Sequence, residues 1–323
     1  MRILFLRRCE KAVILPERKD VHAMELRHVL GNTWVAEANT ALLPVYKITE
    51  KDIVLIATGY AKLDRSGLTA MIEDNGFHLR GVICSHAHFD HSGNVRYLQQ
   101  RCGARAAAHI IEAGISVNPD AYRANYVALT YGKSREYFLE ECFVADAIIG
   151  PEDEYLDFCG VRFGILPLPG HSAGHIGVVT PDNVAYVGDC LLDQQQIDSA
   201  KLPTSMFIAR DLQSKAFLRQ TDYPAYIIAH KAVVTDKTEL DALVDSNSEF
   251  IHRKADELLE DLADGMTFSQ WIAAFCQRES IRTKNEFKFS IIERNFANFV
   301  DWLTDEGRVT VQREYCAKTY YHG

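Results

Sequence analysis

Three histidines and an aspartate lie within six positions of one short segment of this chain. The segment reads Ser85-His86-Ala87-His88-Phe89-Asp90-His91. Histidine and aspartate side chains are costly to bury unless each finds a partner, and a divalent metal satisfies imidazole nitrogens and carboxylate oxygens together. A polar turn that happens to contain histidine explains a single His-x-His pair better than it explains this cluster. The segment therefore predicts a metal site.

An apolar run precedes the cluster and predicts a short buried strand, 81–84, that delivers the histidines to a loop at its carboxyl end. The same arrangement of strand, loop and metal-binding residue occurs three more times. Strand 161–166 leads to Gly170-His171, strand 184–187 to Gly188-Asp189, and strand 226–229 to His230. Four occurrences in one chain indicate that the strand ends converge on a single site.

Other apolar runs predict further strands at 32–36, 41–46, 52–57, 104–109 and 154–158, and helices at 66–75 and 95–101. Strands that alternate with helices are typical of a layered α/β architecture. Between residues 111 and 147 the pattern changes to helical segments rich in tyrosine. Such an insertion would form a lid or wall of a substrate pocket, or simply pack on the sheet.

The composition limits the class of protein. A chain of 323 residues with 47% hydrophobic residues can bury a large core, and a net charge of −9 argues against a general nucleic-acid surface. The eight cysteines form no Cys-x-x-Cys pair, which predicts reduced thiols and a cytoplasmic location. The apolar start, Met1–Leu6, is interrupted by Arg7 and Arg8, so we expect neither export nor membrane anchoring.

The C-terminal part has a different pattern. Long amphipathic helices are expected at 250–263, 268–278 and 291–304, and a small hairpin within 308–317. We therefore predict two domains, a catalytic domain 1–246 and a helical domain 247–323. Residues 285–323 contain five Lys or Arg and six Asp or Glu, a balance that does not favour phosphate binding. Packing on the catalytic domain, or a homodimer contact, is expected ahead of nucleic-acid binding.

The ordered motifs described above closely resemble those of the metallo-β-lactamase superfamily of hydrolases, over about residues 30–235. The resemblance implies an αββα sandwich with a metal pair at one edge of two sheets, and a small, winged-helix-like C-terminal tail. It points to a glyoxalase II-like or lactonase-like member. The ligand set that it implies is His86, His88 and His171 for one metal, Asp90, His91 and His230 for a second, and Asp189 as the bridge between them.

Several positions depart from the family pattern. The usual Asp-Thr-Gly turn reads Ala57-Thr58-Gly59 here, which removes a carboxylate near the site. His230 is followed by Lys231, where the family commonly has Gly or Glu. His175 stands where the family often has a histidine with a supporting role. Lactone-cleaving members often have a tyrosine three positions after the bridging aspartate, and this chain has Leu192 there.

The residue types define the chemistry. Imidazole and carboxylate ligands suit Zn²⁺ and tolerate Fe²⁺ or Mn²⁺. Two such ions that share one water would lower its pKa and supply a hydroxide at neutral pH, which the predicted catalytic residue Asp90 would orient.

The leading hypothesis is therefore a dinuclear metal-dependent hydrolase for a small ester-like molecule, with thioesters favoured over lactones. The sequence contains no P-loop and no Gly-x-Ser-x-Gly motif that would support a competing mechanism. Three alternatives remain: a metal-dependent endonuclease or phosphodiesterase, a mononuclear iron dioxygenase for persulfides, and a metal-binding regulatory protein without turnover.

Overall fold

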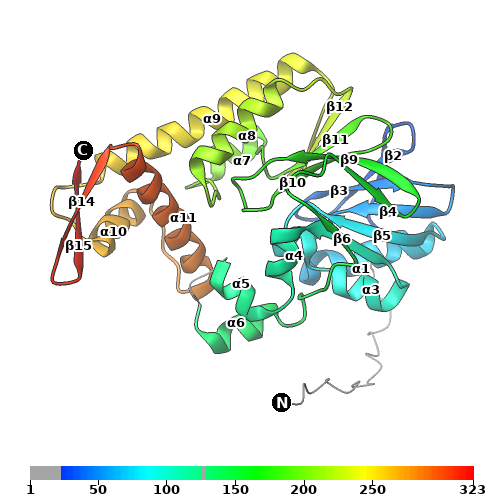
Figure 1. The fold of residues 1–323 in the computed structure, drawn as a ribbon, viewed down its shortest axis with the longest axis horizontal. Helices are drawn as coiled ribbons and strands as arrows, with labels where there is room; N and C mark the ends of the chain where they lie inside the picture. The colour runs from blue at the N-terminus through cyan, green and yellow to red at the C-terminus, as the bar shows by residue number, and fades with distance from the viewer. Residues whose placement is uncertain (1–22, 126–128) are drawn as a thin grey trace.

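The computed structural model describes residues 23–125 and 129–323, so the predictions for Met1–Leu6 lie outside the described residues. Two β-sheets pack face to face with helices on both outer faces, as Figure 1 shows on its right-hand side. This is the αββα sandwich that the sequence predicted. A smaller, mainly helical region follows at the C-terminal end.

The first sheet has seven strands in sequential order. Its first four strands are antiparallel and its last four, from β4 onward, are parallel. The strands are β1 (Leu26–Leu30), β2 (Thr33–Glu37), β3 (Leu42–Lys47), β4 (Asp52–Ile56), β5 (His78–Cys84), β6 (Arg105–His109) and β7 (Ala147–Ile149).

The second sheet has six strands in the order β13-β12-β11-β10-β9-β8. Its pairs are antiparallel except for β11 and β12, which run parallel. The strands are β8 (Tyr155–Phe158), β9 (Val161–Pro167), β10 (Ile176–Val179), β11 (Val184–Gly188), β12 (Ala225–Ile228) and β13 (Ala232–Val234). Cys159 and Gly160, the two residues between β8 and β9, both have positive φ, as a type I′ hairpin turn requires.

The main core lies between the two sheets. Val45 and Ile83 from the first sheet are fully buried with Phe163 and Val178 from the second. Strand β11 is buried along its whole length, which explains why its sequence is a continuous apolar run and does not alternate.

Helices cover the outer faces of the sandwich. Helices α1 (Ala61–Asp74) and α3 (Val95–Cys102) pack on the first sheet, and α8 (Ile208–Arg219) and α9 (Lys237–Glu260) pack on the second. Three helices begin earlier than the sequence indicated. Helix α11 (Glu286–Asp305) starts before the expected residue 291. Helix α1 starts at residue 61 and not 66, and α9 starts at residue 237 and not 250, because the Asp236 side chain accepts a hydrogen bond from Glu239 N and caps the helix.

The insertion between β6 and β7 is helical, as predicted. It contains α4 (Ile110–Ser116), α5 (Pro119–Asn125) and α6 (Tyr131–Phe138). Tyr122 and Phe138 are buried in a stacked pair with ring centroids 5.0 Å apart, and Phe138 also stacks on Phe89 at 4.8 Å. Since Phe89 belongs to the short helix α2 (Phe89–Ser92), the insertion packs directly against the histidine-rich segment.

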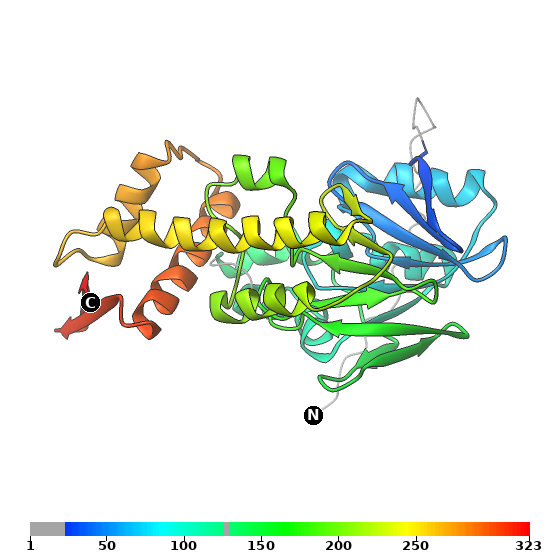
Figure 2. The ribbon, with the colours of Figure 1, turned by 90° about the horizontal axis from the view of Figure 1, so that it is seen from above.

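The C-terminal region contains the expected three helices and hairpin. Helix α9 is followed by α10 (Phe268–Arg278), α11 (Glu286–Asp305) and the strands β14 (Val309–Glu314) and β15 (Ala317–His322). Trp271, Phe296 and Phe299 form the centre of a separate core. Figure 2 shows α9 running from the sandwich to this region.

The predicted domain boundary at residues 246/247 falls inside α9. Leu240 and Val244 pack on the second sheet, whereas Ile251 and Ala255, farther along the same helix, pack in the C-terminal core. The helix is therefore shared by both cores, and the two-domain division stays a prediction.

Two further findings concern residues 23–125 and 129–323 together. None of the helices among the described residues is both long and apolar enough to cross a membrane. The cysteines of the described part form no disulfide with one another.

Candidate metal centre

The structure brings all seven predicted ligand residues to one edge of the sandwich. Donor atoms of His86, His88, His171 and Asp189 lie within 4.8 Å of one another. The same limit holds for a second group, Asp90, His91, Asp189 and His230. Asp189 belongs to both groups, so two sets of side chains that could each hold a cation share one carboxylate.

Both sheets supply these residues through the turns that end their strands. The first sheet contributes the segment after β5, and the second contributes the turns after β9, β11 and β12. Two turns require glycine. A Cβ at Gly188, whose φ is +54°, would lie 2.5 Å from His175 Nε2, and one at Gly170 would lie 2.3 Å from Asp211 Cα.

Three polar atoms at the centre of the cluster are buried and make no hydrogen bond with any described residue: His86 Nε2, His91 Nε2 and Asp189 Oδ1. His91 Nε2 lies 3.1 Å from Asp189 Oδ1, and His171 Nε2 lies 3.3 Å from Asp189 Oδ2. Buried polar groups are normally satisfied, so atoms that converge in this way fit a divalent metal as their missing partner.

Four of the imidazole rings are held from outside the cluster by their Nδ1 atoms. His171 Nδ1 donates to Thr204 O at 2.9 Å, and His230 Nδ1 donates to Thr40 O at 2.7 Å. A carbonyl oxygen can only accept, so in the neutral form of each ring Nε2 carries a lone pair directed at the cluster. The Nδ1 atoms of the other two rings, His86 and His91, lie 3.1 Å from Ser85 Oγ and 3.2 Å from Tyr186 Oη.

The electrostatics favour metal-binding forms on one side of the cluster. Burial lowers the pKa of His86, His88 and His171, which keeps these imidazoles neutral. Burial would raise the pKa of Asp189, but the neighbouring imidazoles, His91 first, hold it well below its usual value. Burial also lowers the pKa of His230, yet the Asp189 carboxylate outweighs it and raises this pKa to about 10.

His175 supports the cluster without facing it. Its Nδ1 bonds to Leu168 O at 3.1 Å, and its Nε2 accepts from Asp189 N at 3.1 Å. Burial lowers its pKa to about 3, so the ring is neutral and fixes the backbone of the shared aspartate. This agrees with the supporting role expected from the sequence.

The Ala57-Thr58-Gly59 turn is supported despite its missing aspartate. Thr58 N and Oγ1 both donate to His91 O, at 2.6 and 3.0 Å. Asp64, fully buried on α1, accepts from Tyr60 N at 2.7 Å and from Thr40 Oγ1 at 3.0 Å. Since Thr40 O holds His230, a carboxylate from a neighbouring helix supports this side of the site.

Sequence reasoning missed Glu112, a buried residue in the first turn of α4. Its Oε2 accepts from Ala87 N, between the two histidines of the first loop, and its Oε1 accepts from Ser172 Oγ and Gly174 N, all at 2.8 Å. One carboxylate thus joins the loops that carry His86, His88 and His171. No local sequence signal marks it, because an acidic residue in the first helical turn is ordinarily exposed.

A cavity of about 300 Å³ opens beside the cluster. Asp90, His171, Asp189 and His230 form its polar end. Its apolar lining includes Leu192, Leu202, Pro203, Phe250, Ile251 and Ile291. The wall therefore combines the connection between α7 (Gln194–Ser199) and α8 with helices α9 and α11.

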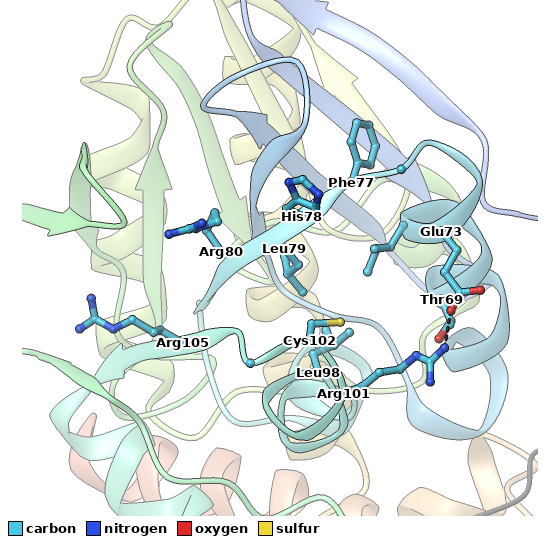
Figure 3. Close-up of a pocket in the computed structure, with 13 residues that line it drawn as sticks. Thr69, Glu73, Phe77, His78, Leu79, Arg80, Leu98, Arg101, Cys102 and Arg105 are labelled. Carbon is cyan, nitrogen blue, oxygen red and sulfur yellow. Dashed lines mark hydrogen bonds and ion pairs between the residues drawn. The ribbon is translucent and has the colours of Figure 1, made fainter.

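A larger cavity, about 780 Å³, lies elsewhere, at the other end of β5 (Figure 3). Its cationic groups already have partners: Arg101 pairs with Glu73, and Arg105 lies over the Phe158 ring at 5.4 Å. It contains none of the seven clustered residues. We therefore place the chemistry at the smaller cavity.

Comparisons with known proteins agree with this geometry. Residues 49–242 match the model of the metallo-beta-lactamase superfamily. The chain is 30% identical over 145 residues to hydroxyacylglutathione hydrolase GloC of Haemophilus influenzae, and 28% identical over 130 residues to hydroxyacylglutathione hydrolase of Ectopseudomonas mendocina. These matches cover 44% and 40% of the chain, and only 62% and 39% of the two relatives.

Solved structures share the fold. A metallo-beta-lactamase family protein from Thermus thermophilus superposes with a TM-score of 0.67 at 17% identity, covering 93% of this chain and 99% of that one. A beta-lactamase domain protein from Burkholderia ambifaria gives 0.70 at 14% identity, with 95% and 97% covered. At this coverage the likeness extends into the C-terminal helices.

Proposed function

Because the chain belongs to the metallo-beta-lactamase superfamily, we propose that it is a hydrolase that binds two divalent ions, zinc foremost, and cleaves a small thioester. The observation that carries the two-ion proposal is the sharing of Asp189 between two groups of donor atoms. The names of the two curated relatives support an acylated thiol as the substrate class.

Asp90 is the residue of the cluster that we propose for orienting the nucleophile. Its side chain is 34% exposed, against 7% for Asp189, and it lines the cavity. Its Oδ2 lies 3.6 Å from His91 Nε2 and 3.7 Å from His230 Nε2. A carboxylate at this position can accept a hydrogen bond from the attacking water and hold it against the acyl carbon.

The bound ions would polarise the acyl carbonyl and lower the pKa of the attacking water. The water releases one proton to solvent, its oxygen forms the new bond to the acyl carbon, the carbon–sulfur bond breaks, and the sulfur leaves as a thiolate. A thiol has a pKa of about 8.5, so it leaves as an anion without prior protonation. The carboxylates Asp90 and Asp189 at the polar end of the cavity would repel a thiolate, so the bound ions would supply the positive charge that receives it.

The test is a panel of substrates of different chemical classes. Thioesters, lactones, phosphodiesters, RNA and persulfides would be offered to the zinc-loaded wild type and to His86→Ala. We expect the wild type to release thiol from the thioesters and the variant to be inactive. Faster turnover of another class would contradict the thioester proposal, and equal turnover by both proteins would contradict the site.

A further inference from the structure

One face of helix α11 points toward the metal centre. Phe287, Ile291, Asn295 and Asn298 follow one another at intervals of four, four and three residues, which places them on the same side of the helix. Figure 1 shows the start of α11 beside α5 and α6 of the insertion. The other side of the helix, with Phe296 and Phe299, packs in the C-terminal core.

The first residue of this face docks on the insertion. The Phe287 ring stacks on Tyr137 at 5.1 Å between centroids and lies 5.8 Å from Phe89. Phe89 stands between His88 and Asp90 in the sequence, so this contact reaches the segment that supplies the first metal ligands. One turn later, Ile291 lines the 300 Å³ cavity.

The next residues hold a segment that orients a ligand. Asn295 Nδ2 donates to Thr204 Oγ1 at 3.2 Å, and Asn298 Nδ2 donates to Ser205 O at 2.7 Å. The carbonyl of the same Thr204 accepts from His171 Nδ1 at 2.9 Å. A hydrogen-bonded chain therefore runs from α11 through Thr204 to an imidazole of the metal cluster.

We propose that α11 is part of the active site, where Ile291 limits the length of the acyl chain and Asn295 positions His171 through Thr204. The proposal rests on the thioesterase function proposed above. A cavity of about 300 Å³ has room for on the order of ten water-sized groups, so a short to medium aliphatic acyl chain fits it. Ile291 and Leu202 are partly exposed in its apolar wall, where a chain would make contact.

The specificity role is tested with straight-chain acyl thioesters of one thiol, from acetyl to decanoyl. Ile291→Trp should lower kcat/KM at least about tenfold for the thioester with the longest acyl chain that the wild type accepts. It should change kcat/KM for the acetyl thioester by less than about twofold. Ile291→Ala should shift the preference to longer chains. The affinities of the matching non-hydrolysable thioethers, measured by calorimetry, should depend on chain length in the same way as kcat/KM does in each variant.

Phe289→Ala is the matched control. Phe289 is a large apolar residue on the same helix, 41% exposed, and it lies outside the cavity lining. Its replacement should leave the chain-length profile unchanged. A profile that is the same in the wild type and both Ile291 variants would overturn the specificity role.

The positioning role is tested by metal retention against a chelator. Asn295→Ala and Thr204→Val each remove one end of the hydrogen bond, and each should speed metal loss by about tenfold. Thr204→Ser keeps the hydroxyl and should retain metal like the wild type, which an effect on packing alone would not explain. Equal metal loss from all of these proteins would overturn the positioning role.

Different results would contradict the thioesterase function and the role of α11. If the wild type hydrolyses none of the thioesters and binds none of the thioethers, the proposed function is wrong and this inference falls with it. If the wild type hydrolyses them but the Ile291 variants keep its profile, only the inference is wrong.

Discussion

The metal cluster and the wall of the cavity beside it are assembled in different ways. The cluster is made of turns that directly follow strands, and four of its seven residues lie within His86–His91. The wall combines Leu202, Phe250 and Ile291, which come from three separate elements of the chain. The chemistry of the site is therefore encoded in local motifs, whereas the shape of its cavity depends on how distant elements pack.

The difference extends to the interactions. Buried side chains of the cluster are joined by hydrogen bonds and close charge pairs. The wall combines apolar side chains, such as Phe250 and Ile291, with polar ones, such as Asn247 and the Asp211–Lys215 pair. Buried polar networks tolerate substitution poorly, while apolar walls tolerate changes that preserve volume. We expect substitutions in the cluster to abolish activity and substitutions in the wall to redirect it.

Asp189→Ala should have the largest effect, because it removes the carboxylate shared by both groups of donors. We expect kcat/KM to fall by at least about a thousandfold and the metal content to drop at both sites. Mass spectrometry of the intact protein together with steady-state kinetics would measure both. Retention of a full metal complement would contradict the shared role.

Asp90→Asn should separate catalysis from metal binding. The amide keeps an oxygen ligand but loses the negative charge, so turnover should fall by about a hundredfold while most of the metal stays bound. The measurement is kcat at matched metal content. If turnover and metal content fall in parallel, Asp90 only holds a metal.

Glu112→Ala should destabilise the two loops that carry His86, His88 and His171 although Glu112 is not itself a predicted metal ligand. Three hydrogen-bond donors from these loops lose their acceptor. The expected loss in the free energy of unfolding is about 2–4 kcal/mol, measured by urea denaturation of the metal-free protein. Ser172→Ala removes only one of the three hydrogen bonds and should cost less. An equal cost for both variants would contradict the joining role of Glu112.

Glu141, in the insertion, should make stability depend on pH. Burial raises its pKa to about 7 in the folded protein, above the value in the unfolded chain. The folded state therefore binds the proton more tightly, and this contribution to stability, about 2–3 kcal/mol, is lost as the pH rises from about 4.5 through 7. Glu141→Gln should flatten the stability profile in that interval; an unchanged slope would show that Glu141 is not the cause.

The sequence predicted the metal cluster better than it predicted the wall of the cavity. The layered α/β architecture and the convergence of His86, Asp189 and His230 follow from apolar strands that end in metal-binding residues, a pattern visible within a few positions; the αββα arrangement was implied by the family resemblance. His230 also lies in the cluster although an atypical residue, Lys231, follows it: its Nε2 is 3.4 Å from Asp189 Oδ2. Short-range patterns were enough for this part of the site.

The features of the site and fold that the sequence did not predict depend on how side chains pack in the folded protein. Glu112 and Asn295 look like ordinary polar helix residues, and only the fold brings them to the Ala87 and Thr204 loops. Helix α8 was not predicted either, because buried Asp211 and Lys215 interrupt its apolar face; in the structure these two side chains, four residues apart on the helix, pair at 2.5 Å. The partners of Glu112 and Asn295, in contrast, lie far away in the sequence and leave no periodic signal.

The most direct test of the two-ion thioesterase is a titration of the metal-free protein with zinc while thioester hydrolysis is recorded. The shared Asp189 predicts that activity rises until two zinc ions per chain are bound and then stays constant. Full activity with one ion per chain, or a bound iron with oxygen consumption in place of thiol release, would contradict it.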